Sequence, residues 1–239
     1  MIADTAKDLR GIALAATDAS GYFAALYARV TARIGASIAD ATFADGPRLD
    51  RFATGFASLY IDASRDPSSR SGCWQASWKV VTDPRVLIEQ HLLLGINAHV
   101  NYDLPRAVVA AADERGDLAS IRPDFEMVNT VLAATYVDVV KALGRVSRWA
   151  NAAARLGGGN AFNFSLRAAR AQAWQAATRM YPMSDGARRG YVGELDRGVS
   201  VLAYLITQPS PVLRPFIGLA RRLEEHDRTK VVAALLGER

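Results

Sequence analysis

Alanine constrains this chain more than any other residue, because it occupies 43 of the 239 positions while strand-like alternation of β-branched residues is nearly absent. Alanine loses no side-chain entropy in a helix and is the best intrinsic helix former, whereas strands draw on Val, Ile, Thr and aromatic residues. Apolar residues recur at intervals of three and four, which is the spacing of one helix face. The sequence therefore predicts an all-α protein.

Periodicity, together with Gly and Pro at the breaks, divides the chain into helices. The predicted helices cover residues 5–16, 21–38, 49–63, 75–82, 86–102, 104–114, 124–142, 145–155, 165–179, 186–207, 215–225 and 229–236. The glycines at 157–159 are expected to stop a helix, since no strand or dinucleotide-binding spacing accompanies them. Because no long linker or repeat is visible, we expect residues 1–239 to form a single domain, a multi-helix bundle around a buried central helix.

The remaining composition excludes several classes of protein. The single cysteine, Cys73, excludes an intramolecular disulfide framework and a multi-cysteine zinc site within one chain. Charged residues near the N-terminus interrupt any signal-peptide core, and no run reaches the roughly 18 apolar residues of a membrane span. We therefore expect a cytoplasmic protein with no membrane span.

The net charge of +5 is unevenly distributed, because the first 120 residues carry −2 and the remainder +7. Of the 29 basic residues, 25 are arginines, and they stand singly or in pairs along alanine-rich segments. No basic run, aromatic interleaving or helix-turn-helix spacing is present. We expect these arginines to form solvated helix faces and expect no nucleic-acid partner.

The densest polar cluster lies between Glu89 and Leu104 and includes two of the three histidines of the chain. On a helix, His91, Gly95, His99 and Asp103 form one stripe, each four residues from the next. The other side of the helix carries Gln90, Asn97 and Asn101. Leucine and isoleucine fill the rest, so we predict a buried helix whose polar groups need internal partners.

The spacing of the stripe limits its chemistry. His99 and Asp103 are about 6 Å apart along the axis, so Asp103 can orient His99 as a general base, or both can bind one divalent metal ion. His91 lies about 12 Å before His99 and would act from the far side of Gly95. The missing side chain at Gly95 leaves room for a ligand or another helix. We predict His91, His99 and Asp103 as catalytic residues.

A metal ion at His99 and Asp103 would need a further ligand. Asp124 and Glu126 are the best candidates, although Asp124 also suits the N-cap of the following helix. The paired Glu-x-x-His motif of ferritin-like di-metal sites is absent. The cofactor therefore stays open between none and one divalent metal ion.

Aromatic residues near the cluster are candidates for substrate binding. We predict this role for Trp74, Trp78 and Tyr102, with the alternative that they only fill the core. Cys73 would be a nucleophile only with an activating histidine nearby.

The segment His91–Leu104, with the pattern HLLLGxNAHxNxDL, resembles the central motif of an uncharacterised bacterial family that carries a domain of unknown function. Weaker similarity extends over most of the chain, at residues 52–63, 74–78, 124–129 and 170–174. The resemblance implies that the histidines and asparagines belong to a shared pattern, and it brings no established reaction.

The sequence favours an enzyme that acts on a largely apolar small molecule in a helical cavity. His99, oriented by Asp103, would serve as general base or metal ligand in a hydrolase or a lyase- or cyclase-type step, such as one of secondary metabolism. The alternative is a non-catalytic ligand-binding or structural protein, in which the polar stripe is a buried hydrogen-bond network. The oligomeric state stays open.

Overall fold

The computed structural model describes residues 1–114, 117–149, 159–208 and 214–238, without the side chains of 159–164 and 214–215. Within these residues the protein is all-α, as predicted, and contains no strand. An isolated antiparallel bridge joins Ser147 and Glu224.

The helices agree with the prediction apart from shifts at their ends and two differences described below. The α-helices are α1 (Ile2–Ala15), α2 (Ser20–Ala39), α3 (Gly46–Arg65), α4 (Gly72–Trp78), α5 (Ile88–Ala98), α6 (Leu104–Asp113), α7 (Arg122–Val146), α9 (Gly159–Met180), α10 (Asp185–Thr207), α11 (Arg214–Arg222) and α12 (Arg228–Leu236). Short 3₁₀ turns cover Pro67–Ser69 (η1) and Ala119–Ile121 (η3), and a π-helical turn, η2, covers His99–Asp103.

The first difference concerns α7, which continues to Val146 although the sequence predicts a break near residue 143. A lone glycine inside a helix costs only about 1 kcal/mol relative to alanine, so Gly144 does not end α7. Most of the predicted helix 145–155, and the glycines at 157 and 158, lie outside the described residues. Gly159 begins α9.

The second difference lies in the centre, where the predicted helices 86–102 and 104–114 form one continuous rod of α5, η2 and α6. Pro105 lacks an N–H and its ring would clash with a carbonyl one turn earlier in a regular α-helix. The rod accommodates Pro105 by widening into the π turn, in which the Leu104 N–H donates to the His99 carbonyl five residues before it. The helix thus passes the proline without ending.

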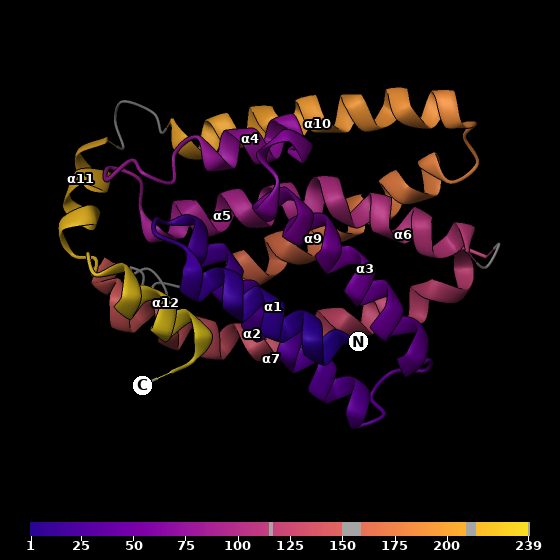
Figure 1. Cartoon of the computed structure of the whole chain (residues 1–239), viewed down its shortest axis with the longest axis horizontal. Coiled ribbons are helices and arrows are strands. Elements are labelled where there is room, and N and C mark those ends of the chain that lie inside the picture. The colour runs from indigo at the N-terminus through magenta and orange to yellow at the C-terminus, as the bar shows by residue number, and fades with distance from the viewer. Residues whose placement is uncertain (115–116, 150–158, 209–213, 239) are drawn as a thin grey trace.

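The central rod crosses the middle of the molecule (Figure 1). Helices α10 and α4 lie on one side of it, and α1, α2 and α7 lie on the other, while α9 crosses behind. Buried side chains form two apolar clusters, and the rod contributes to both. Leu92 belongs to the cluster that includes α1, α2, α4 and α12, whereas Leu104 and Val108 belong to the cluster that includes α3, α7 and α9.

One polar side of α5 attaches to α10. The Gln90 amide donates to the Ile206 carbonyl at 2.6 Å, and the Asn97 amide donates to the Val199 carbonyl at 2.9 Å. Asn101 donates in turn to the Asn97 side chain at 2.9 Å. These bonds confirm the prediction of a buried central helix, and they give the polar groups on this side of it internal partners.

Gly95 marks the closest approach of α2 to the rod. A Cβ atom on Gly95 would lie 2.3 Å from the ring of Phe23, so the glycine receives an aromatic side chain of α2 and not a ligand. The Phe23 ring packs edge-on toward His99, with ring centroids 5.8 Å apart.

We expect Gly95→Ala to lower the free energy of unfolding by roughly 1–3 kcal/mol, because the added methyl group overpacks a rigid contact. The matched control is Gly55→Ala in α3, where a Cβ atom would have no neighbouring atom within 4 Å. There the higher helix propensity of alanine should stabilise the protein by up to about 1 kcal/mol. Urea unfolding of both variants measures the difference, and equal effects would contradict the close approach at Gly95.

Candidate functional site

A cavity of about 310 Å³ lies between α2, α3, α5 and α7. This volume is at the lower end of the range for small-molecule sites. The wall is predominantly apolar and includes Leu26, Val30, Phe52, Phe56, Leu92, Ile96, Val128, Leu132 and Val139.

The cavity follows one face of α5. Glu89, Leu93, Ile96 and Val100 all line it, and their spacing of three and four residues is that of a single helix face. Leu93 is 38% exposed. The shape is therefore elongated along the helix.

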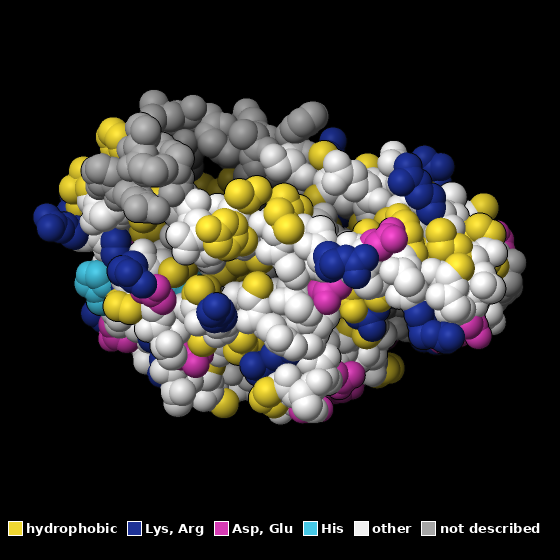
Figure 2. All heavy atoms as spheres, turned by 90° about the horizontal axis from the view of Figure 1, so that it is seen from above, with side chains coloured by type: hydrophobic (Ala, Val, Ile, Leu, Met, Phe, Trp, Pro, Cys, Tyr) yellow, Lys and Arg dark blue, Asp and Glu magenta, His cyan; other side chains and the backbone are white. Residues whose placement is uncertain are grey.

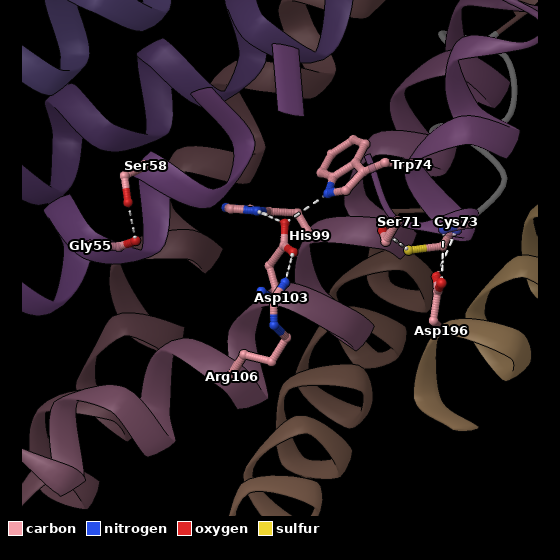
Figure 3. Close-up of polar contacts among 10 residues, drawn as sticks. Gly55, Ser58, Ser71, Cys73, Trp74, His99, Asp103, Arg106 and Asp196 are labelled. Atoms are coloured by element: carbon pink, nitrogen blue, oxygen red, sulfur yellow. Dashed lines mark hydrogen bonds and ion pairs between the residues drawn. The ribbon is translucent and has the colours of Figure 1, made fainter. Parts of the chain in front are cut away.

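The polar centre of the site is the carboxylate of Asp103, which is 1% exposed. The Trp74 Nε1–H donates to Oδ2 at 2.9 Å, and Nδ1 of His99 lies 3.1 Å from the same oxygen. Arg106 reaches Oδ1 at 3.3 Å. Figure 3 shows these three groups, from α4, η2 and α6, converging on the one carboxylate.

The contact with Asp103 determines the tautomer of His99. A carboxylate only accepts hydrogen bonds, so Nδ1 of the neutral imidazole carries the hydrogen and Nε2 carries the lone pair. Nε2 is buried, has no hydrogen-bond partner among the described residues, and belongs to a side chain that lines the cavity. Burial lowers the pKa of His99, while the hydrogen bond to Asp103 and its charge act in the opposite direction. The result is a neutral imidazole with an unsatisfied acceptor at the cavity.

Aromatic rings hold the imidazole in place. Phe56 stacks on His99 with ring centroids 3.7 Å apart and an interplanar angle of 9°, and Tyr27 packs edge-on at 4.5 Å. The sequence gives no sign of the pairing of Phe56 with His99. The roles of Tyr27 and of the Trp74 indole N–H were missed for the same reason, since these residues come from other helices.

The arrangement fits a base better than a metal site. Among the described residues no group of three or more His, Cys, Asp or Glu side chains could hold a metal ion. His99 and Asp103 face each other, and Trp74 and Arg106 occupy further acceptor positions of the carboxylate. His99 and Asp103 would therefore have to give up these hydrogen bonds before they could bind one metal ion together.

Asp124 serves neither of its two predicted roles. Its carboxylate accepts hydrogen bonds from the backbone N–H groups of Ala44 and Asp45, at 2.7 and 3.1 Å, and from Arg48 at 2.8 Å. It thus ties the connection between α2 and α3 to α7. Glu126 bonds to Asn129 on the exposed side of α7.

The structure does not bring His91 to the same cavity as His99. His91 lines a separate cavity of about 20 Å³, together with Gly95 and Trp78, while the Phe23 ring lies over Gly95 between the two histidines. Burial, and then the positive charge of Arg221, lower the pKa of His91 to about 4. The predicted cooperation of the two histidines is therefore not supported by their placement.

The three predicted substrate-binding aromatics also lie away from the larger cavity. Trp74 supports Asp103, and Trp78 packs beneath Arg70, whose guanidinium is 4.2 Å from the ring centroid. Tyr102 is covered by Arg106 at 4.7 Å. Their side chains leave α4 and η2 on other faces, so α2, α3 and α7 supply the apolar wall instead.

Cys73 is held in the core at the start of α4. The carboxylate of Asp196 in α10 accepts hydrogen bonds from the backbone N–H groups of Gly72 and Cys73, both at 2.8 Å (Figure 3). Burial raises the pKa of the Cys73 thiol, which makes it a poor nucleophile. Asp196 therefore positions α4, and with it Trp74.

The carboxyl groups of Glu89 and Glu224 form a pair at one end of the cavity. Glu224 accepts from the Ile88 N–H at 2.9 Å and pairs with Arg221 at 3.2 Å. Burial, the hydrogen bond with Glu89 and the negative charge of Glu89 together raise the pKa of Glu224 to about 9. The pair of Glu224 and Glu89 therefore holds a proton near neutral pH.

The outer surface carries no concentrated basic face in the view of Figure 2, where Lys and Arg stand among hydrophobic and acidic side chains. Within the described residues, the helical stretch Ala119–Val146 is long and apolar enough to cross a membrane by length and composition. Val128, Leu132 and Val139 of this stretch line the cavity.

The model of a family of unknown function, DUF5995, matches residues 2–209. The chain therefore belongs to this family, in agreement with the resemblance seen in the sequence. No curated protein and no solved structure matches the chain.

The raised pKa of Glu224 predicts a pH dependence of stability. Between the ordinary pKa of 4.5 and about 9, the folded state binds more protons than the unfolded state, so the free energy of unfolding falls as pH rises through this window. Glu224→Gln should flatten that slope in urea unfolding measured across the window. The control Glu225→Gln should leave it unchanged, because the pKa of Glu225 is lowered. A slope that persists in Glu224→Gln would contradict the protonated carboxyl.

Proposed function

We propose that the protein is an enzyme that binds an elongated, largely apolar small molecule beside α5 and removes a proton from it with His99. One observation carries the proposal: the lone-pair nitrogen of a buried imidazole that lines an apolar cavity has no partner among the described residues, while Asp103 holds the opposite nitrogen. A buried polar atom normally finds a hydrogen bond, so an unsatisfied acceptor at a cavity wall points to a ligand.

The chemistry follows from the geometry. When Nε2 takes a proton, the imidazole becomes a cation, and the carboxylate of Asp103 at 3.1 Å stabilises it. The electron pair of the broken bond stays on the substrate, which must therefore carry an acidic proton next to a group that accepts the charge. An apolar cavity holds water poorly, so proton transfer of the isomerase, lyase or cyclase type is favoured over hydrolysis.

Arg170 supplies a positive charge to the same cavity. Its side chain is 5% exposed and lines the wall, where Nε donates to Asn129 and an Nη donates to the Phe125 carbonyl, both at 2.7 Å. Burial lowers the pKa of Arg170 to about 10, which keeps it charged at neutral pH. No ion pair with an acidic residue is found for Arg170 among the described residues, so this charge is available to stabilise negative charge that develops on a substrate.

The competing function is ligand binding without catalysis. The bond from Trp74 to Asp103 ties α4 to the central rod, and a buried network of this kind can serve packing alone. The protonation state of His99 and its effect on turnover separate the two functions.

We expect nitrogen-15 NMR of the histidine rings at pH 7 to show Nδ1 protonated and Nε2 unprotonated in His99. His91→Asn and His226→Asn assign the signals of the remaining histidines. Because burial lowers the pKa of His99, the ring should stay neutral to a pH below the ordinary value for histidine. A proton on Nε2, or a charged ring at pH 7, would rule out His99 as the base.

Turnover can be tested with linear β,γ-unsaturated ketones, in which loss of the α-proton and reprotonation at the γ-carbon give the conjugated isomer. We expect His99→Gln to reduce the isomerisation rate by roughly 10²–10⁴-fold, the usual contribution of a general base. His226→Gln, at an exposed position, should retain the rate. If His99→Gln binds the ketone and isomerises it as fast as the unmodified protein, the site only binds ligands.

A further inference from the structure

The cavity contains a second unsatisfied polar group, at the opposite end from His99. Glu89 lines the cavity, and both of its carboxylate oxygens are buried without a hydrogen-bond donor from a backbone N–H or a basic side chain among the described residues. Glu89 in α5 and His99 in η2 lie ten residues apart along the central rod, which places their backbones about 15 Å apart along the axis. The α5 side chains between them that line the cavity, Leu92, Leu93 and Ile96, are apolar.

Among the described residues, Glu89 has few hydrogen-bond donors and no ion pair with a basic side chain. Its polar neighbour is Glu224, which can share one proton with it. A carboxylate offers about four acceptor positions, so one shared proton leaves most of them unfilled. Arg221 donates a hydrogen bond to Glu224 at 3.2 Å, and no ion pair to Glu89 is found in the described part of the chain. Burying such a group is costly unless a donor of positive charge reaches it.

We propose that Glu89 binds the ammonium head group of the ligand, which identifies the ligand as a long-chain amine with its reactive part at His99. The placement of the reactive part at His99 rests on the proposed function. The contact of the head group depends only on Glu89. An ammonium group supplies both the charge and the hydrogen bonds that the carboxylate lacks.

The dimensions of the cavity agree with such a ligand. A span of about 15 Å corresponds to roughly a dozen bonds of an extended chain. The volume of 310 Å³ equals that of about ten water molecules at roughly 30 Å³ each, and a chain atom is of similar size. A linear alkyl amine of about ten carbons therefore fills this volume, and one of about dodecyl length spans the distance between Glu89 and His99.

Calorimetric titration of the full chain with dodecylamine and dodecan-1-ol, both below the concentration at which they aggregate, tests the head-group contact. We expect the amine to bind more tightly than the alcohol. Glu89→Gln should weaken amine binding by roughly tenfold to a hundredfold, the value of a hydrogen bond to a charged partner, while changing alcohol binding much less. Glu194→Gln, an exposed glutamate of α10, is the matched control and should change neither.

Two further variants separate failure of this proposal from failure of the catalytic one. His99→Gln should keep the affinity for dodecylamine, because the head group binds at the other end of the cavity. Ile96→Phe, in the middle of the wall, should weaken dodecylamine but retain butylamine, which needs only the Glu89 end. If dodecylamine does not bind, or if Glu89→Gln and Glu89→Asp both leave its preference over the alcohol unchanged, the proposal is wrong, whatever the role of His99.

Discussion

The buried carboxylate of Asp103 is the interaction on which the site depends. A charge at 1% exposure is tolerated only with good partners, and Asp103 finds them in Trp74, His99 and Arg106. These partners come from α4, η2 and α6, so a single carboxylate holds the short α4 against the central rod. It also selects the tautomer of His99, which leaves the lone pair on the buried Nε2. Removing this charge would therefore affect packing and chemistry together.

The path of the central rod explains why there is a cavity beside it. The π turn lets the rod continue past Pro105, and Gly95 lets Phe23 of α2 approach closely. One side of α5 is fastened to α10 through Gln90 and Asn97. The opposite side faces α3 and α7, and the space between these helices and α5 is lined mainly by apolar side chains. Interiors are usually close-packed, so an elongated cavity with polar groups at both ends is a feature that a ligand would fill.

The distribution of polarity in this cavity links the two proposals. Its middle supplies apolar contact area, which favours binding of any hydrocarbon of suitable length. In the two proposals, Glu89 would receive a positive head group and His99 would act as the base, while Arg170 in the same wall would add a positive charge. A ligand bound in this way would enter in one orientation and present one end to the base. The apolar wall excludes water from that end and so strengthens the electrostatic interactions there.

The sequence by itself determined the helical class, most helix positions and the presence of a buried polar stripe, because these follow from alanine content and from spacing within single helices. The pairing of His99 with Asp103 was equally accessible, since both lie within one turn of the same helix. Sequence reasoning failed where partners come from distant helices. It could not show that Phe23 fills the gap at Gly95 and separates His91 from His99, or that Phe56 and not Trp78 or Tyr102 lines the cavity beside the base. Only tertiary packing decides which faces of α2, α3, α4 and α7 meet the central rod, because a helix carries its pattern of side chains but not the identity of its neighbours.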